Sequence, residues 1–382
     1  MPSLNCLKMT NRENFYFTGK CLALDENPAF KSEVIEKCKN DLIDWEQFVG
    51  LCSNHLILPA IYLKFQSHGI IEYLPEDLAE FLKEVHHLNS VRNKLILQQL
   101  QEIMNILNEH EIFPTLLKGA GNLIDELYAD IGERILGDID FLVPEKDYLL
   151  SAELMKNIGY STVSAIPAYS DIKSMKHYPR IYHPDFPAVI EIHRLPVREE
   201  YQSWFNTETI DQEKKVVSSL CGCFVESDDH KIIHNFIHSQ LSNKGYLHGI
   251  VSFRDLYDFY LVSKRTQVKN SIAHIKTKQI AISYFAFAGK VFGINENLYP
   301  RVNFSSWLFE KKHTLNLNSN TFYRTHLSIL FFAERILKGY IGQFVKSFYS
   351  GKMRQSVIRR LSDRKWYGDH IKLYTRFFKK KQ

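Results

Sequence analysis

The feature that most constrains the fold is a short apolar segment that begins with two carboxylates, Asp138-Ile139-Asp140-Phe141-Leu142-Val143. Side chains alternate between the two faces of a β-strand, so this pattern predicts a strand with both carboxylates on one face. Two neighbouring carboxylates repel each other and contribute nothing to folding by themselves. A divalent cation between them would remove the repulsion, and oxygen ligands of this kind suit Mg²⁺.

The sequence around this pair of carboxylates decides how strongly it indicates a metal site. With 43 acidic residues in 382, about five acid-x-acid pairs are expected by chance, and most such pairs are solvated. Here a short apolar strand is expected at 112–117, followed by a glycine turn and a helix. A third carboxylate, Glu191, lies in a further apolar segment at 186–193, on the face opposite its isoleucine neighbours. If the two acid-bearing strands pair, three carboxylates form one cluster that can hold two metal ions.

Several motifs follow one another in the order Leu117-Lys118-Gly119, Tyr128, Arg134, Asp138-x-Asp140, Gly159-Tyr160 and Glu191-x-His193. This order resembles the nucleotidyltransferase fold of the DNA polymerase β superfamily. It is most similar to a bacterial nucleotidyltransferase-like family found in some biosynthetic gene clusters. The likeness is strongest over residues 110–195 and continues more weakly to about residue 300.

The resemblance implies an α+β fold, with a nucleotidyltransferase-type mixed β-sheet core and large flanking helical regions. It implies that Asp138, Asp140 and Glu191 are the catalytic residues and the ligands of two Mg²⁺ ions, with Mn²⁺ as a substitute. It also implies that Gly119 lies at the turn that holds the triphosphate of a nucleotide.

The glycine turn departs from the pattern of many superfamily members, which have a serine or a second glycine after the first. Ala120 follows Gly119 and offers no hydroxyl, so phosphate binding would rely on backbone N–H groups and Lys118. The turn also lies far ahead of the first acid, because Gly119 precedes Asp138 by 19 positions. Both departures bear on how the nucleotide would lie.

Two further residues near the acids have more than one interpretation. Arg134 precedes the first acid by four residues, where a guanidinium can bind a nucleotide phosphate bidentately. It can equally pair with Asp130 or Glu133, although the family pattern also has an arginine here. His193 lies on the same strand face as Glu191, where it would tune that acid, contact the acceptor or base, or cover the sheet.

A helix is expected over residues 228–241, with three histidines that recur every four residues, His230, His234 and His238. This stripe would either bind a metal ion or form the wet edge of a helix beside the cleft. His238, together with the later Arg254 and Asp255, matches a recurring feature of the family's helical part. These three residues would contact the base or the acceptor, or tie two helices together.

The chain is expected to have four parts. Residues 1–110 form a helical region that ends in a long helix from Leu78 to Glu109. Residues 111–225 form the α/β core, with four or five strands and a small hairpin near 216–225. Residues 226–350 continue as helices, with joints at Gly293 and Pro300, and residues 351–382 form a basic aromatic tail.

The tail carries the positive charge of the protein. Residues 351–382 hold 11 Lys or Arg against 2 Asp or Glu, so the rest of the chain has a net charge of −4 within a total of +5. Interleaved cations and aromatic rings suit nucleic acid, because rings stack on bases and cations contact phosphates. The same composition suits an anionic membrane surface, or a docked helix with a solvated end.

Composition excludes several classes of protein. The apolar (45%) and charged (24%) fractions are ordinary for a globular protein, and no apolar run is long enough for a transmembrane helix. We therefore expect a cytoplasmic protein. Six scattered cysteines do not form a disulfide framework, and Cys221-Gly222-Cys223 indicates a tight turn rather than a zinc site.

These observations lead to two functional hypotheses. In the first, the protein is an enzyme that transfers a nucleoside monophosphate from an NTP to an acceptor hydroxyl and releases pyrophosphate. The acceptor (RNA, protein, sugar or peptide precursor) and the base of the nucleotide, ATP included, are left open by the sequence. In the second, the protein is a non-catalytic module that binds nucleotide or RNA through the basic tail.

Overall fold

The computed structural model describes residues 8–164, 171–294, 303–319, 325, 326, 329, 341–362 and 368 of the 382-residue chain. The chain forms two compact units, Met1–Asn318 and Ser319–Gln382. This division falls inside the region 226–350. Across the described ranges, no helix combines the length and the apolar character that spanning a membrane requires.

Helices form the N-terminal part of the first unit: α1 (Asn11–Leu22), α2 (Pro28–Lys39), α3 (Trp45–Asn54), α4 (Leu58–Ser67), the 3₁₀ turn η1 (Ile71–Tyr73) and α5 (Glu76–Glu109). Polar side chains cap the N-termini of α1, α2 and α3. Thr10, Asn27 and Asp44 each accept a hydrogen bond from a backbone N–H in the first turn of the helix that follows. These bonds satisfy N–H groups that have no partner within the helix. The predicted helical character of this region is confirmed.

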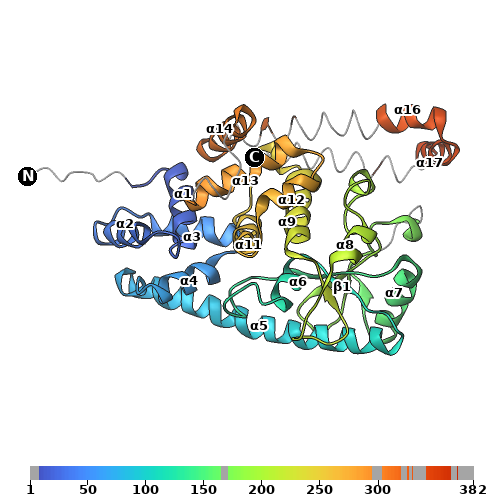
Figure 1. The fold of residues 1–382 in the computed structure, drawn as a ribbon, viewed down its shortest axis with the longest axis horizontal. Helices are drawn as coiled ribbons and strands as arrows, with labels where there is room; N and C mark the ends of the chain where they lie inside the picture. Colours follow the sequence, from blue (N-terminus) through green and yellow to red (C-terminus); the bar gives the residue numbers. More distant parts are fainter. Residues whose placement is uncertain are drawn as a thin grey trace, which may run out of the picture. The chain divides into compact units, whose positions relative to one another are not determined.

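The longest helix among the described residues, α5, has 34 residues and runs along one whole side of the first unit (Figure 1). It begins after Pro75, and Glu76 and Asp77 lie in its first turn, where the helix dipole favours negative charge. Its buried stripe includes Leu82 near the start and Leu107 near the end. It packs against α4 and also against α7 (Tyr148–Asn157), so one straight element joins the N-terminal helices to the α/β core.

A seven-stranded mixed sheet forms the α/β core, with the order β3-β4-β5-β2-β1-β7-β6. The strands are β1 (Thr115–Leu116), β2 (Asp138–Leu142), β3 (Ser161–Thr162), β4 (Ile181–Tyr182), β5 (Val189–His193), β6 (Lys215–Val216) and β7 (Phe224–Val225). The predicted number of strands was too low, because the hairpin β6–β7 joins the main sheet. Strand β7 pairs in parallel with β1, which extends the sheet by two strands.

The two acid-bearing strands, β2 and β5, are neighbours, which is the condition for the carboxylates to gather, and they run parallel. Asp138 lies opposite Val189, and Asp140 lies opposite Glu191. The other face of both strands is apolar and fully buried, with Ile139, Phe141, Ile190 and Ile192. The alternation of side chains along each strand thus separates a core face from a carboxylate face.

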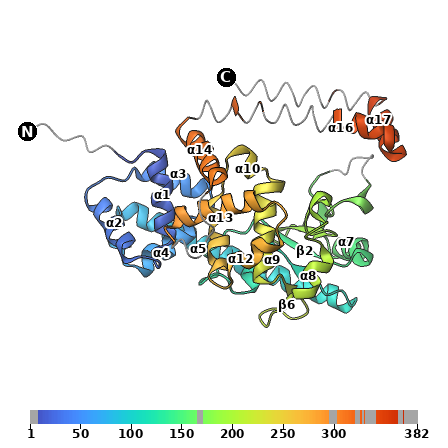
Figure 2. The same cartoon turned by 45° about the horizontal axis from the view of Figure 1, so that its top comes forward.

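Further helices and turns connect the strands and complete the first unit. In chain order they are α6 (Lys118–Ile124), η2 (Glu145–Asp147), α7, η3 (Ile172–Ser174), η4 (Glu199–Tyr201), α8 (Thr207–Glu213), α9 (Asp228–Phe236), the π-helical turn η5 (Ile237–Ser242), α10 (Gly245–His248), α11 (Phe253–Ser263), α12 (Val268–His274), α13 (Lys278–Phe292) and α14 (Phe304–Asn318). The helix predicted for 228–241 is present, but its last part widens into the π-turn. Helices α13 and α14 return to pack on α1, which joins the two helical parts of the unit (Figure 2).

Of the two helix boundaries predicted at Gly293 and Pro300, the first lies within the described residues. Gly293 ends α13 with a left-handed φ of 63°, as a helix-terminating glycine often does. Pro300 lies outside the described residues. In the tight turn predicted at Cys221–Cys223, Gly222 has a φ of 76°, and neither flanking cysteine forms a disulfide.

The second unit is described mainly over a helical hairpin, α16 (Gly342–Tyr349) and α17 (Gly351–Leu361), whose helices pack on each other. Arg354 closes the hairpin by donating hydrogen bonds to the carbonyls of Ser347 and Phe348, both at 3.2 Å. Of the predicted basic tail, residues 351–362 and 368 are described, and the remainder lies outside the described residues.

Candidate active site

The site is centred on the carboxylate face of β2 and β5. One ligand atom from each of Asp140, Glu191 and His193 lies within 4.8 Å of the others, and in the described part of the chain this is the group that could hold a metal ion. Asp138 points from the same face of β2, two residues earlier, and its side chain is more exposed (38%) than that of Asp140 (3%). Two of the three predicted acids therefore meet closely, and the third lies at the more open edge.

Basic side chains surround these carboxylates. Oδ1 of Asp140 lies 2.7 Å from Nζ of Lys118 and 2.8 Å from Nε2 of His193. The same His193 nitrogen lies 3.4 Å from Glu191, and Arg180 lies 3.4 Å from Glu191 and 3.6 Å from Asp138. The protein thus offsets the repulsion between its acids with its own cations, which a metal ion would displace or supplement.

The electrostatics differ among the three acids. Burial raises the pKa of Asp140, but the charge of Lys118 and the hydrogen bond to His193 outweigh it and hold the pKa well below its usual range. Burial likewise raises the pKa of Glu191, but the hydrogen bond from His193 and the charges of His177 and Lys118 together outweigh it, so the pKa is lowered. Burial and the charge of Asp140 raise the pKa of Asp138.

The glycine turn holds Lys118 in an uncommon backbone conformation. Lys118 has a φ of 52°, in the left-handed region that residues with a Cβ rarely adopt. Close packing explains the glycines that follow: a Cβ on Gly121 would lie 2.6 Å from the carbonyl oxygen of Leu116, and one on Gly119 would lie 2.8 Å from the Leu136 side chain. Strain of this kind is typical of functional sites and persists only where the surrounding structure enforces it.

Arg134 pairs with Asp258, a carboxylate far from it in the sequence. Its Nε lies 2.9 Å from Oδ1 of Asp258, its Nη2 lies 2.8 Å from Oδ2, and Tyr128 donates to the same carboxylate at 2.8 Å. Neither Asp130 nor Glu133 is its partner. Burial lowers the pKa of Arg134, but the charge of Asp258, the neighbouring Tyr128 and the hydrogen bonds to Asp258 together outweigh it and raise the pKa above its usual range. The pair ties the loop before β2 to α11.

That loop is also held from the other side by α5. Asn89 donates to the carbonyls of Gly132 at 2.7 Å and Arg134 at 3.1 Å. Asn93, which is fully buried, donates to the carbonyls of Ile131 at 2.7 Å and Arg134 at 2.8 Å. Buried carbonyl groups need such partners, so α5 sets the path of the chain into the first acid.

A pocket lies over the carboxylate face and contains about 760 Å³ of space between the side chains, part of it open to solvent. Part of its lining comes from α6 and β2, with Lys118, Gly119, Asp138 and Asp140. The remainder comes from the loop before β2 and from the helices that follow the sheet, with Lys231, His238, Arg254, Asp255 and Asp258 among its members. Most of the predicted site residues therefore face one cavity.

The predicted histidine stripe on α9 is largely buried. His230 and His234 are almost inaccessible, and Nδ1 of His234 lies 2.8 Å from the buried Glu226 carboxylate. His238, in the π-turn, lies 3.2 Å from Asn243, and burial lowers its pKa well below the usual value. None of the three belongs to the metal-competent group of the described residues. Among the described residues the stripe forms no metal cluster, and the buried His230 is no wet helix edge, whereas His234 and the half-buried His238 line the pocket.

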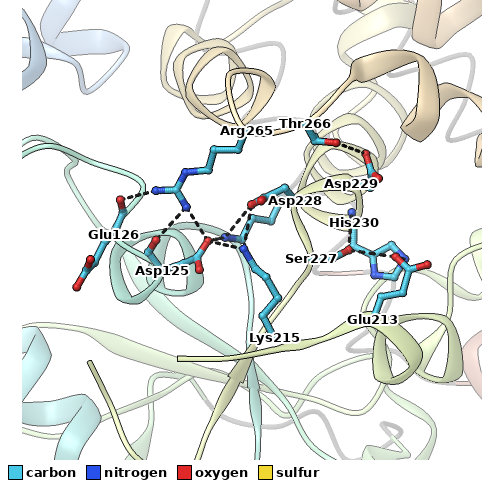
Figure 3. Close-up of polar contacts among 11 residues, drawn as sticks. Asp125, Glu126, Glu213, Lys215, Ser227, Asp228, Asp229, His230, Arg265 and Thr266 are labelled. Carbon is cyan, nitrogen blue, oxygen red and sulfur yellow. Dashed lines mark hydrogen bonds and ion pairs between the residues drawn. The ribbon is translucent and has the colours of Figure 1, made fainter. Parts of the chain in front are cut away.

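A charged cluster joins the end of α6 to β6, α9 and the residues after α11 (Figure 3). Asp125 accepts hydrogen bonds from Lys215 at 2.9 Å, from Arg265 at 2.9 Å and from Lys231. Lys215 also bonds Asp228 at 3.1 Å. Burial raises the pKa of Asp125, but the hydrogen bond from Lys231 and the adjoining cations outweigh it, so the pKa is lowered. Lys231 lines the pocket, and its ammonium group is engaged by Asp125.

Three residues near the site were not singled out from the sequence. Asp258 follows Arg254 by four residues, which places both on one side of α11. Arg180 lies just before β4, next to the strand that carries Glu191. Burial and the charge of Lys118 lower the pKa of Lys176 to about 8. The helical spacing was visible for the first, whereas the other two required the order of the strands.

The comparison with known proteins matches this architecture. A family model described as "Uncharacterised nucleotidyltransferase" matches residues 41–290, which contain all seven strands and every pocket residue named above. No curated protein is similar enough to the chain to count as a match. Because the matched range covers more than half of the 382 residues, the chain belongs to this family of uncharacterised nucleotidyltransferases.

Proposed function

We propose that this protein transfers a nucleoside monophosphate from an NTP to an acceptor hydroxyl, with release of pyrophosphate. The observation that carries the proposal is the parallel register of β2 and β5, which sets Asp140, at the wall of a pocket, opposite Glu191. Membership of a nucleotidyltransferase family supports an NTP as the substrate. The superfamily fold suggested by the sequence remains part of this proposal.

The donor set fits a divalent cation. Asp140, Glu191 and His193 offer ligand atoms within 4.8 Å, and Asp138 adds a carboxylate at the open edge. Carboxylate oxygens suit Mg²⁺, and Mn²⁺ accepts the same ligands together with imidazole. Two such ions would activate the attacking hydroxyl and neutralise charge on the leaving pyrophosphate.

The protein's own groups would position the substrates and move the proton. Lys118 would exchange Asp140 for a phosphate oxygen when the nucleotide binds, and the backbone of Gly119 and Ala120 would approach the phosphates. Asp138 is the most exposed of the three acids and has a raised pKa, which suits it to accept the proton of the attacking hydroxyl. Pyrophosphate leaves with the electron pair of the broken P–O bond.

The helices after the sheet would select the base and the acceptor. His238 and Asp255 line the pocket, and the low pKa of His238 keeps its imidazole neutral, so it can both donate and accept a hydrogen bond. His193 is fully buried between Asp140 and Glu191, so its part is to orient these acids rather than to contact the acceptor.

Calorimetric titration of the four NTPs, with and without Mg²⁺, tests the proposal on wild type and the Asp138→Ala/Asp140→Ala variant. We expect Mg²⁺-dependent binding of at least one NTP to wild type and its loss in the variant. Asp211→Ala, at an exposed position of α8, is the matched control and should bind like wild type. Equal binding by wild type and the double variant would remove the metal from the proposal, and no binding of any NTP would remove the nucleotide.

A transfer assay with labelled NTP and cell extract then tests the chemistry. Asp140→Asn preserves the shape of the side chain but removes its charge, so it should transfer no label, and circular dichroism checks that the variant is folded. Activity retained by this variant would show that Asp140 is not a catalytic ligand.

A further inference from the structure

The pocket contains four Lys or Arg side chains, and they differ in what they contact. Lys118 is bonded to Asp140, Lys231 to Asp125, and Arg134 to Asp258. Arg134 and Lys231 are therefore engaged by carboxylates within the protein, and Lys118 can reach a phosphate only by leaving Asp140. A triphosphate carries several negative charges, and binding one requires a cation that can turn its donors toward it.

Arg254, the fourth of these side chains, forms no hydrogen bond to a carboxylate among the described residues. Its only neighbouring carboxylate within 4 Å among the described residues is that of Asp255, which lies 3.8 Å from Nε, beyond hydrogen-bond distance. Nε is buried and has no hydrogen-bond partner in the described structure. A buried donor without a partner costs free energy, so its presence at the wall of a pocket indicates a ligand that supplies the acceptor.

The helix that carries Arg254 is fixed in place around it. Asn235 donates to the carbonyl of Asp255 at 2.9 Å, and the N–H of Phe253 donates to His55 at 3.2 Å. Four residues later, Asp258 holds Arg134. These bonds anchor the first two turns of α11, so the Arg254 side chain projects from a defined position and retains its own donors for a ligand.

We propose that Arg254, rather than Arg134, binds the terminal phosphates of the nucleoside triphosphate. This inference rests on the proposed function, because it assigns one part of the substrate to one part of the same pocket. A guanidinium presents a planar pair of donors that matches two phosphate oxygens, which Lys118 as a point charge does not. Arg134 has the same chemistry, but its fork is already filled by Asp258.

The proposal separates the two ends of the nucleotide. The acids of β2 and β5 would hold the α-phosphate through the metal, and Arg254 would hold the phosphates that leave. Loss of Arg254 should therefore weaken ligands that have a β- or γ-phosphate and leave a nucleoside monophosphate unaffected. An arginine that contacted the base or the acceptor would produce a different pattern.

The experiment measures the Kd of the full-length protein for an NTP, the corresponding NDP and the NMP in the presence of Mg²⁺. In Arg254→Gln, affinity for the NTP should fall by about ten- to a hundredfold, as expected for a lost charge-assisted hydrogen-bond pair, while affinity for the NMP stays constant. Arg254→Lys retains the charge without the fork and should lie between the two. Magnesium pyrophosphate should compete with the NTP on wild type and less well on Arg254→Gln.

Controls keep this inference distinct from the proposed function. Arg12→Gln, at a half-exposed arginine of α1, should bind all three nucleotides as wild type does. If wild type binds no NTP with Mg²⁺, both the function and the inference are wrong. If wild type prefers the NTP over the NMP and both Arg254 variants keep the same preference, only the inference is overturned. Equal weakening of the NTP and the NMP would also overturn it, because Arg254 would then contact another part of the nucleotide.

Discussion

The ammonium nitrogen of Lys118 lies 2.7 Å from Oδ1 of Asp140, so a lysine occupies a carboxylate oxygen that we assign to a metal ion. Two cations at one oxygen repel each other, and the repulsion is strong where water is scarce. Lys118 also has a left-handed backbone conformation, which the turn enforces. The lysine and the metal are therefore competitors until a phosphate gives the lysine another partner.

Lys118→Met separates these two effects. Without the competing ammonium, Mn²⁺ alone should bind about tenfold more tightly, whereas the NTP should bind more weakly because a phosphate partner is lost. Mn²⁺ binding can be followed by electron paramagnetic resonance and NTP binding by calorimetry. Lys146→Met, at an exposed position of η2, should change neither. Weaker Mn²⁺ binding in Lys118→Met would mean that the lysine supports the metal rather than competing with it.

Breaking the buried Arg134–Asp258 pair should cost stability. Asp258→Asn leaves a buried guanidinium without its counter-charge, which costs about 3–5 kcal/mol in the free energy of unfolding. Replacing both partners, as in Arg134→Leu/Asp258→Leu, removes the unpaired charge and should cost less than the single change. Urea unfolding measures both. A double variant that is less stable than Asp258→Asn would contradict the role of this pair as a structural tie.

The glycines of the chain allow a matched test of packing at the turn. A Cβ on Gly121 would meet the backbone oxygen of Leu116 at 2.6 Å, which no side-chain rotation relieves, so Gly121→Ala should destabilise the protein by about 1–3 kcal/mol. Gly50 lies within α3 with no heavy atom within 4 Å of the same position. Gly50→Ala should therefore stabilise the helix by up to about 1 kcal/mol. Thermal unfolding compares the two, and equal effects would contradict the packing argument.

Two buried histidines predict loss of stability in mild acid. Burial lowers the pKa of His55 and of His313 from 6.5 to about 4. Between pH 6.5 and 4 these two histidines bind protons in the unfolded chain but stay neutral in the folded protein. The free energy of unfolding should therefore fall as the pH drops through this range. Urea unfolding across this range should show a smaller fall in His313→Gln. His87→Gln, at an exposed position of α5, should retain the full effect, and an unchanged slope in His313→Gln would exclude His313 as its source.

Local patterns in the sequence were sufficient for much of the core of the site. The alternation around Asp138 and Asp140 predicted which side chains share a face, and the apolar segment around Glu191 predicted a second strand, whose parallel pairing with β2 only the structure shows. The length of α5 followed from its periodicity and the lack of breakers. These features depend on residues that are close in sequence, where strand and helix geometry fix the outcome.

Other features depend on long-range contacts and could not be predicted in this way. Arg134 and Asp258 are 124 residues apart, and nearer acids offered equally plausible partners. The hairpin β6–β7 was expected near its observed place, but nothing in its sequence indicates that it pairs with β1. The histidines of α9 form a regular stripe, and only the packing around them shows that the stripe is buried.

The hydrogen bonds from α5 to the loop before β2 have a consequence for sequence variation in this family. The loop contributes carbonyl groups, which every amino acid possesses, while α5 contributes the side-chain amides of Asn89 and Asn93. Substitutions in the loop can therefore preserve the contacts, whereas substitutions at the two asparagines remove them. Two side chains that lie 49 and 45 positions before the first acid thus help to keep it in place.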